Sequence, residues 1–154
     1  MLAGCDDGTA VTRVDRLVSG VSGYVTPLAL GGMAVEVHGA PFAGVAPAEV
    51  VARLRLPPSY PTAAGFRLAA PSEAERLVLD FNPATPGRAA AACAGEVRSA
   101  AGGRREGFSV TATLCSGPRV VTTGHLEARR ARADDPAAFA QAMSRLFLEI
   151  FSEG

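Results

Sequence analysis

The stretch from residue 135 to residue 151 carries the pattern that most restricts the fold. Asp135 is a favourable helix N-cap, and Pro136 suits the first position of a helix. Large apolar residues then recur at helical spacing, at Phe139, Met143, Leu146, Phe147, Ile150 and Phe151. Burial of each such side chain is worth roughly 1.5–3 kcal/mol. We therefore predict a helix whose apolar stripe packs on a β-sheet, because a half-exposed sheet needs a cover; a partner-binding surface is the alternative.

Two segments in the second half of the chain predict a β-hairpin. Residues 108–115 alternate apolar and hydroxyl side chains over their whole length, and residues 119–129 are rich in β-formers. Ser116, Gly117 and Pro118 supply the turn between them. Gly124 interrupts the second strand, which indicates either a bulge or a close approach of another element.

Shorter segments predict the rest of the sheet. Residues 33–38 alternate as in a half-buried strand, with Met33 on one side and His38 on the other. Residues 77–81 are apolar except for Asp80, which indicates a central strand. Residues 66–70 predict a short edge strand, and residues 11–18 fit either a strand or a short helix.

The remaining segments predict one clear helix and one short one. Pro47 suits the first helical position, the stripe Val50, Val51, Leu54 follows, and Pro57 with Pro58 stops the helix. Residues 89–97 predict a short helix around Cys93. Residues 20–32 are interrupted by glycine and proline, which indicates a loop-rich approach to the core.

These elements predict an α+β fold. We expect an antiparallel-rich sheet of four to five strands, covered on one face by two main helices. A length of 154 residues corresponds to one domain, which we place at residues 11–154 after a tether at residues 1–10.

The net charge and the hydropathy of the chain argue against a nucleic-acid partner and against a membrane-spanning segment. The formal net charge is zero, whereas a nucleic-acid partner requires a basic face. We therefore expect no nucleic-acid partner. No stretch approaches the ~18–20 continuous apolar residues that span a bilayer.

The N-terminal tetrapeptide Leu2-Ala3-Gly4-Cys5 resembles a lipobox, the recognition site of bacterial lipoprotein signal peptidase. The resemblance covers four residues, followed by a polar run that reads as a tether. It implies that Cys5 becomes the acylated first residue of the mature protein, with palmitate among its acyl chains. Together with Phe81-Asn82-Pro83, the cysteine pair, the hairpin and the C-terminal helix, it resembles uncharacterised small envelope lipoproteins of GC-rich proteobacteria.

The resemblance implies a location in the bacterial cell envelope, held by membrane lipid through acylated Cys5 and facing the periplasm. Asp6 and Asp7 follow the cysteine, and an Asp at this place resembles the signal that retains lipoproteins in the inner membrane. A secretory signal needs a basic region and an apolar region of roughly 7–15 residues before cleavage. Only Met1 precedes the motif here, so we expect a misplaced start codon or a chain trimmed to its mature domain.

The two other cysteines are expected to pair. In an oxidising compartment Cys93 and Cys115 would form a disulfide that closes a loop of roughly 20 residues, worth about 3 kcal/mol in the chain-entropy model. Their spacing is too wide for a C-x-x-C redox motif, and no histidine lies nearby in sequence to complete a zinc site.

Candidate chemistry is restricted to a few polar strand residues. His38 and His125, with Asp80 and Glu127, are expected on a polar sheet face, where Glu36 would join them. Asp80 interrupts an apolar strand, so we expect an arginine or a backbone amide to pair with it. The sequence contains no G-x-S-x-G elbow, no H-E-x-x-H motif and no phosphate-binding glycine loop. We therefore assign no catalytic residue, no metal ligand and no cofactor.

The sequence predicts a non-enzymatic envelope lipoprotein that serves as a binding or accessory module, with an envelope protein as partner. The alternative is a small hydrolase or metal-binding enzyme that uses His38 or His125 with nearby carboxylates. A deep pocket with either histidine beside Asp80 or Glu127 would favour the enzyme. A flat polar face would favour the binding module.

Overall fold

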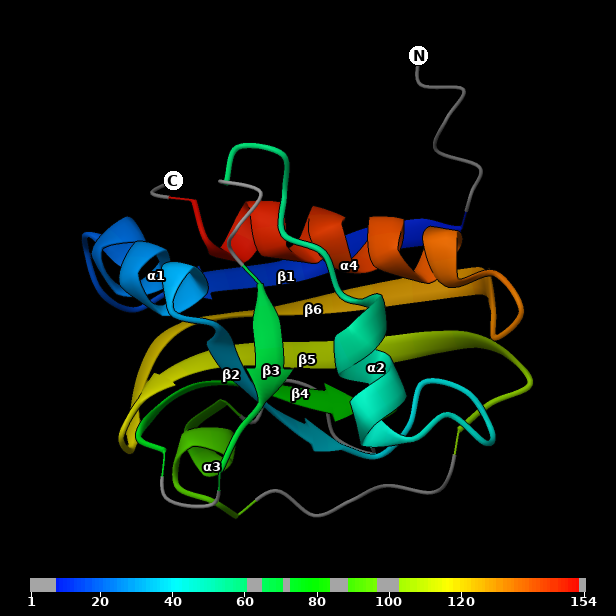
Figure 1. Cartoon of the computed structure of the whole chain (residues 1–154), viewed down its shortest axis with the longest axis horizontal. Coiled ribbons are helices and arrows are strands. Elements are labelled where there is room, and N and C mark those ends of the chain that lie inside the picture. Colours follow the sequence, from blue (N-terminus) through cyan, green and yellow to red (C-terminus); the bar gives the residue numbers. More distant parts are fainter. Residues whose placement is uncertain (1–7, 61–64, 71–72, 84–88, 97–102, 153–154) are drawn as a thin grey trace.

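A computed structural model describes residues 8–60, 65–70, 73–83, 89–96 and 103–152 of the chain. Across these residues the elements run in the order β1 (Thr9–Arg16), α1 (Val21–Leu30), β2 (Met33–His38), α2 (Pro47–Arg53), β3 (Phe66–Leu68), β4 (Glu75–Phe81), α3 (Ala89–Cys93), β5 (Glu106–Ser116), β6 (Arg119–Arg132) and α4 (Pro136–Ile150). Figure 1 shows α4 lying along the sheet beside β1 and β6. Because β1 begins at Thr9, the sheet takes in two residues assigned above to the tether.

The described strands form one mixed sheet in the order β1-β6-β5-β4-β2-β3. β1, β6 and β5 are antiparallel to their neighbours, and β4 is antiparallel to β5, whereas β2 runs parallel to both β4 and β3. The α+β class is confirmed, but the prediction of an antiparallel-rich sheet of four to five strands was wrong. The sheet has six strands in the described part of the chain, and β2 is parallel both to β3, which follows it through α2, and to β4.

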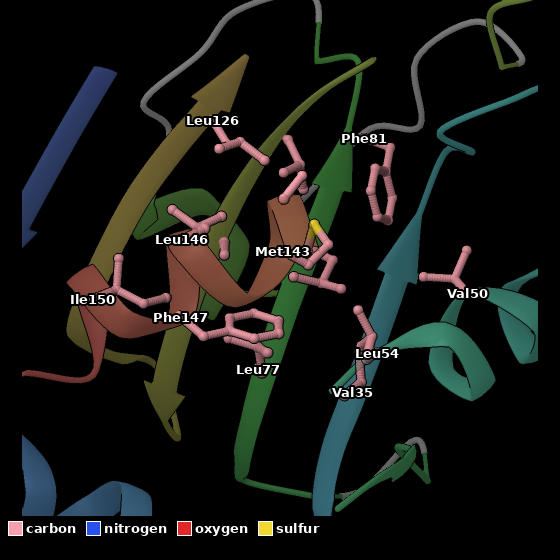
Figure 2. Close-up of a cluster of buried hydrophobic side chains, with 14 of the residues drawn as sticks. Val35, Val50, Leu54, Leu77, Phe81, Leu126, Met143, Leu146, Phe147 and Ile150 are labelled. Atoms are coloured by element: carbon pink, nitrogen blue, oxygen red, sulfur yellow. The ribbon is translucent and has the colours of Figure 1, made fainter. Parts of the chain in front are cut away.

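The main core lies between the sheet and α4, which covers one face. The helix begins at Pro136, with the Asp135 carboxylate accepting a hydrogen bond from the Ala138 amide at 3.1 Å. Its apolar stripe is fully buried, as predicted, and Figure 2 shows Met143, Leu146 and Phe147 pointing at the sheet. Val50 of α2 and Val25 of α1 join the same core.

Gly124 shows how closely α4 approaches the sheet. A Cβ atom at this position would lie 2.5 Å from Cγ2 of Ile150 and 3.1 Å from Cδ1 of Leu146. The glycine therefore marks a close approach of the helix, one of the two outcomes that the sequence left open.

The segment before β2 was predicted wrongly. Residues 21–30 form helix α1 instead of a loop-rich stretch, with Pro27 inside the helix. Val21, Val25 and Ala29 recur every four residues and are at most 1% exposed. Burial of this stripe outweighs the local preference of glycine and proline for turns, which is why the helix forms.

The second face of the sheet carries the short helix α3, whereas α2 and α4, the two main helices expected from the sequence, contribute to the core on the first face. A separate small cluster joins α3 to the second face through Ala92, Cys93, Cys115 and Val78. Val78 lies between Leu77 and Leu79 of the main core and therefore points to the opposite side. Among the described helices, none is both long and apolar enough to cross a bilayer.

Candidate polar ligand site

The face of the sheet opposite α4 carries a transverse row of polar residues. The strand register pairs His38 with Asp80, Asp80 with Thr111, Thr111 with His125, and His125 with Arg13. Directly paired residues share a face, so the structure places His38, Asp80 and His125 on one polar surface. Glu127 lies two residues beyond His125 and joins them.

This surface divides into two groups, of which the first lies on β2 and β4. His38 Nε2 contacts the Glu36 carboxylate, and Arg76 Nε donates to the same carboxylate at 2.9 Å. Burial favours a higher pKa for Glu36, but the hydrogen bonds from His38 and Arg76 outweigh it and hold the pKa below its ordinary value. Glu36 is therefore ionised and satisfied within this group.

Asp80 differs from Glu36 in lacking such partners. In the described part of the chain, its Oδ1 atom is buried and accepts no hydrogen bond, so the expected pairing with an arginine or a backbone amide is not found for this atom. Burial raises the pKa of Asp80, and the positive charge of His38 only partly offsets that rise. The neighbouring arginine, Arg76, points instead to Glu36 and to the Ala74 and Cys93 carbonyls.

The second group is a chain of three side chains on β5 and β6. Thr111 Oγ1 lies 2.9 Å from His125 Nδ1, and His125 Nε2 lies 2.7 Å from a carboxylate oxygen of Glu127. A carboxylate only accepts hydrogen bonds, so Nε2 carries a proton and donates it to Glu127. When His125 is neutral, Nδ1 is then an acceptor, and the Thr111 hydroxyl donates to it.

A pocket of about 360 Å³ opens beside this second group. Its polar lining comes from Arg13, Asp15, Thr111, Thr123 and His125. Ala89 and Ala90 of α3 form part of its wall, and Cys93 at the end of that helix is bonded to Cys115 of β5. The sulfur atoms are 2.04 Å apart, so the cysteine pair expected from the sequence is at disulfide distance. Cys5 lies outside the described residues.

The structure does not bring the two histidines to a common site. His38 lies on β2 and His125 on β6, with β4 and β5 between them. Three interstrand spacings separate the backbones of the two residues by about 14 Å. No group of three or more His, Cys, Asp or Glu side chains suited to a metal ion occurs among the described residues. Each histidine instead contacts a glutamate two residues away on its own strand.

Sequence reasoning found His125 and Glu127 but missed the groups that complete the pocket. Thr111 lies in the alternating hydroxyl pattern of residues 108–115, which was used only to predict a strand. Arg13 and Asp15 come from the opposite end of the chain, on the edge strand β1. Their place beside His125 and Thr123 follows from strand pairing, which local sequence does not encode.

A larger cavity, of about 550 Å³, lies between α4, β6 and residues 56–58. Its described lining combines apolar residues with Thr9, Arg130, Gln141, Ser144 and Arg145 and contains no imidazole and no carboxylate. The smaller pocket is the better candidate site because it brings a guanidinium, a carboxylate and an imidazole together, and placed polar groups, not volume, give a site its specificity.

Comparison of the chain with protein-family models, with curated proteins and with solved structures finds no match.

Proposed function

We propose that this chain is the folded domain of a bacterial envelope lipoprotein. It is anchored to membrane lipid through acylated Cys5, faces the periplasm from the inner membrane, and acts as a non-enzymatic binding or accessory module for an envelope component. The N-terminal lipobox supports the anchor, and Asp6 with Asp7 supports the choice of membrane.

The observation that carries the proposal is the disulfide between Cys93 and Cys115. Structural disulfides persist in oxidising compartments such as the periplasm and are rare in the bacterial cytosol. The three cysteines thus divide into one for lipid and two for the covalent attachment of α3 to the sheet. An intracellular location would leave this attachment reduced and α3 without its covalent hold.

The pocket on the polar face supports a binding role. Its polar side chains come from three neighbouring strands, which fix their positions through the hydrogen-bonded ladder. Anchoring at a membrane raises the local concentration of the domain near other envelope components, so weak contacts are sufficient.

The chain Thr111–His125–Glu127 is the observation that favours the alternative, a small hydrolase. A hydroxyl, an imidazole and a carboxylate in hydrogen-bond sequence are the parts of a nucleophilic triad, and Thr111 and His125 line the pocket. The binding role is preferred because β5 and β6 are both central strands. Their amides serve the ladders on either side and are not available to stabilise an oxyanion.

Intact mass of the full-length precursor, expressed in a bacterium, tests the proposed location. We expect loss of everything before Cys5, a gain that matches acyl chains, and two alkylated thiols only after reduction. The matched control is Cys5→Ala, which removes the acyl gain and keeps the two reducible cysteines. Unprocessed protein with three thiols that react without reduction would overturn both the anchor and the compartment.

Ester hydrolysis by the purified domain separates the two roles. We expect turnover of p-nitrophenyl acetate equal to that of the Thr111→Val variant. A rate that falls both in Thr111→Val and in His125→Ala, while the fold stays intact, would establish the hydrolase in place of the binding module.

A further inference from the structure

Hydrogen bonds inside the pocket fix which groups it offers to a ligand. The Thr123 hydroxyl donates to the Ala112 carbonyl at 3.0 Å, so in its 3.0 Å contact with Thr113 it is the acceptor. With the imidazole of His125 in its neutral form, the Thr111 hydroxyl donates to its Nδ1 atom. Both threonines therefore have only acceptor capacity left, and together with the Asp15 carboxylate they create an acceptor-rich wall.

Arg13 supplies the pocket with hydrogen-bond donors, opposite in kind to the acceptors of this wall. Its Nε atom donates to Asp15 at 2.7 Å, and the remaining guanidinium N–H groups have no partner among the described residues. Arg13 pairs with His125 in the strand register and Asp15 with Thr123. The donor, Arg13, and the acceptor, Asp15, thus lie two residues apart on the same face of β1.

We propose that this pocket binds a small zwitterion, namely a free amino acid with an aliphatic side chain. The ammonium group donates to Thr111, Thr123 and Asp15, and the carboxylate accepts from the Arg13 guanidinium. The inference rests on the proposed binding role and names its ligand class.

The apolar part of the lining selects the side chain of the ligand. Leu17, Val120, Ala89 and Ala90 line the pocket, and Leu17 is 59% exposed, so its side chain is accessible to a ligand. A branched aliphatic side chain would cover Leu17. A volume of about 360 Å³ accommodates a molecule of this size.

Titration of the folded, unacylated domain by two-dimensional NMR tests the inference with three probes of matched shape. L-Leucine carries both charges, 4-methylpentanoate lacks the ammonium group, and 3-methylbutylamine lacks the carboxylate. We expect saturable shifts at His125 and Thr123 with L-leucine, and binding at least about tenfold weaker for each of the other two. Equal affinity of either analogue, or no saturable shift at millimolar L-leucine, would overturn the proposal.

Two variants complete the test. Asp15→Asn lowers the affinity for L-leucine about tenfold, because one charge-assisted hydrogen bond is lost. Asp134→Asn is the matched control: its carboxylate also belongs to an exposed arginine pair, with Arg132, but it does not line the pocket. Unchanged binding in Asp15→Asn would overturn the assignment. Binding is read without the lipid, so its failure would leave the mass experiment and the proposed location standing.

Discussion

On one face of the sheet, the 15-residue helix α4 buries a stripe of aromatic and aliphatic side chains. On the opposite face, the 5-residue helix α3 is bonded to β5 through the Cys93–Cys115 disulfide. α4 needs no covalent link because its stripe is buried in the main core. α3 presents only Ala92 and Cys93 to a small cluster, and an isolated helix so short is unstable in water. The difference leaves the α3 face open enough to hold a polar pocket.

The largest expected effect comes from disrupting the core between α4 and the sheet. Phe139→Ala should lower the free energy of unfolding by about 3–5 kcal/mol. The ring contacts those of Phe42, Phe81 and Phe108, with centroids 6.2, 6.2 and 5.2 Å away, and its removal leaves a cavity among them. Urea unfolding followed by circular dichroism measures the loss. Leu148→Ala on the same helix is the control, since Leu148 is 56% exposed, and equal losses in both variants would contradict this account of the core.

A smaller effect is expected from removing the disulfide that holds α3 on the opposite face. Replacing both Cys93 and Cys115 with alanine should lower the free energy of unfolding by about 3 kcal/mol, because the bond closes a loop with a sequence separation of 22. Thermal unfolding with and without dithiothreitol measures it. Reductant should destabilise the wild type and leave the double variant unchanged. A wild type that is insensitive to reductant would show that α3 is held without the bond.

The smallest effect concerns Asp80 and depends on pH. Burial raises the pKa of Asp80 in the folded state, so the folded state keeps this proton up to a higher pH than the unfolded state does. Wild-type stability is therefore lost as pH rises from about pH 4, the pKa of an exposed Asp, through the raised folded-state value. Asp80→Asn removes the buried charge and should raise the free energy of unfolding by about 1 kcal/mol at neutral pH.

Urea titrations at several pH values measure this difference, which should vanish below about pH 4. Asp134→Asn is the control, because the exposed Asp134 carboxylate contributes little at any pH. A difference for Asp80→Asn that grows as pH falls would mean that the carboxylate is stabilised in the folded protein after all.

The elements with strong local signals were predictable. The Asp135-Pro136 start, the stripe of α4, the hairpin β5–β6 and the strand β2 follow from capping and from periodicities of 3.6 and 2, which are properties of the sequence itself. Helix α1 was not predictable, because Gly23 and Pro27 oppose a helix locally while Val21 and Val25 favour one only when a core exists to bury them.

The candidate site divides in the same way. Alternation alone placed His38, Asp80, His125 and Glu127 on a polar face, because side chains on a strand point to opposite sides in turn. The pairing of Thr111 with His125, the arrival of Arg13 and Asp15 on β1, and the orphaned Oδ1 of Asp80 were not predictable. They depend on strand order, on register and on which arginine a carboxylate meets.

The sequence by itself determined the elements other than α1, the polar and apolar sides of the strands, and the expected pair among the cysteines. The tertiary structure alone decided that β2 joins β4 in parallel, that α3 covers the second face, and that three strands bring a guanidinium, a carboxylate and two hydroxyls to one pocket. Local periodicity is a property of neighbouring residues. Strand order is a property of the whole chain, set by how the apolar faces of all the elements are buried together.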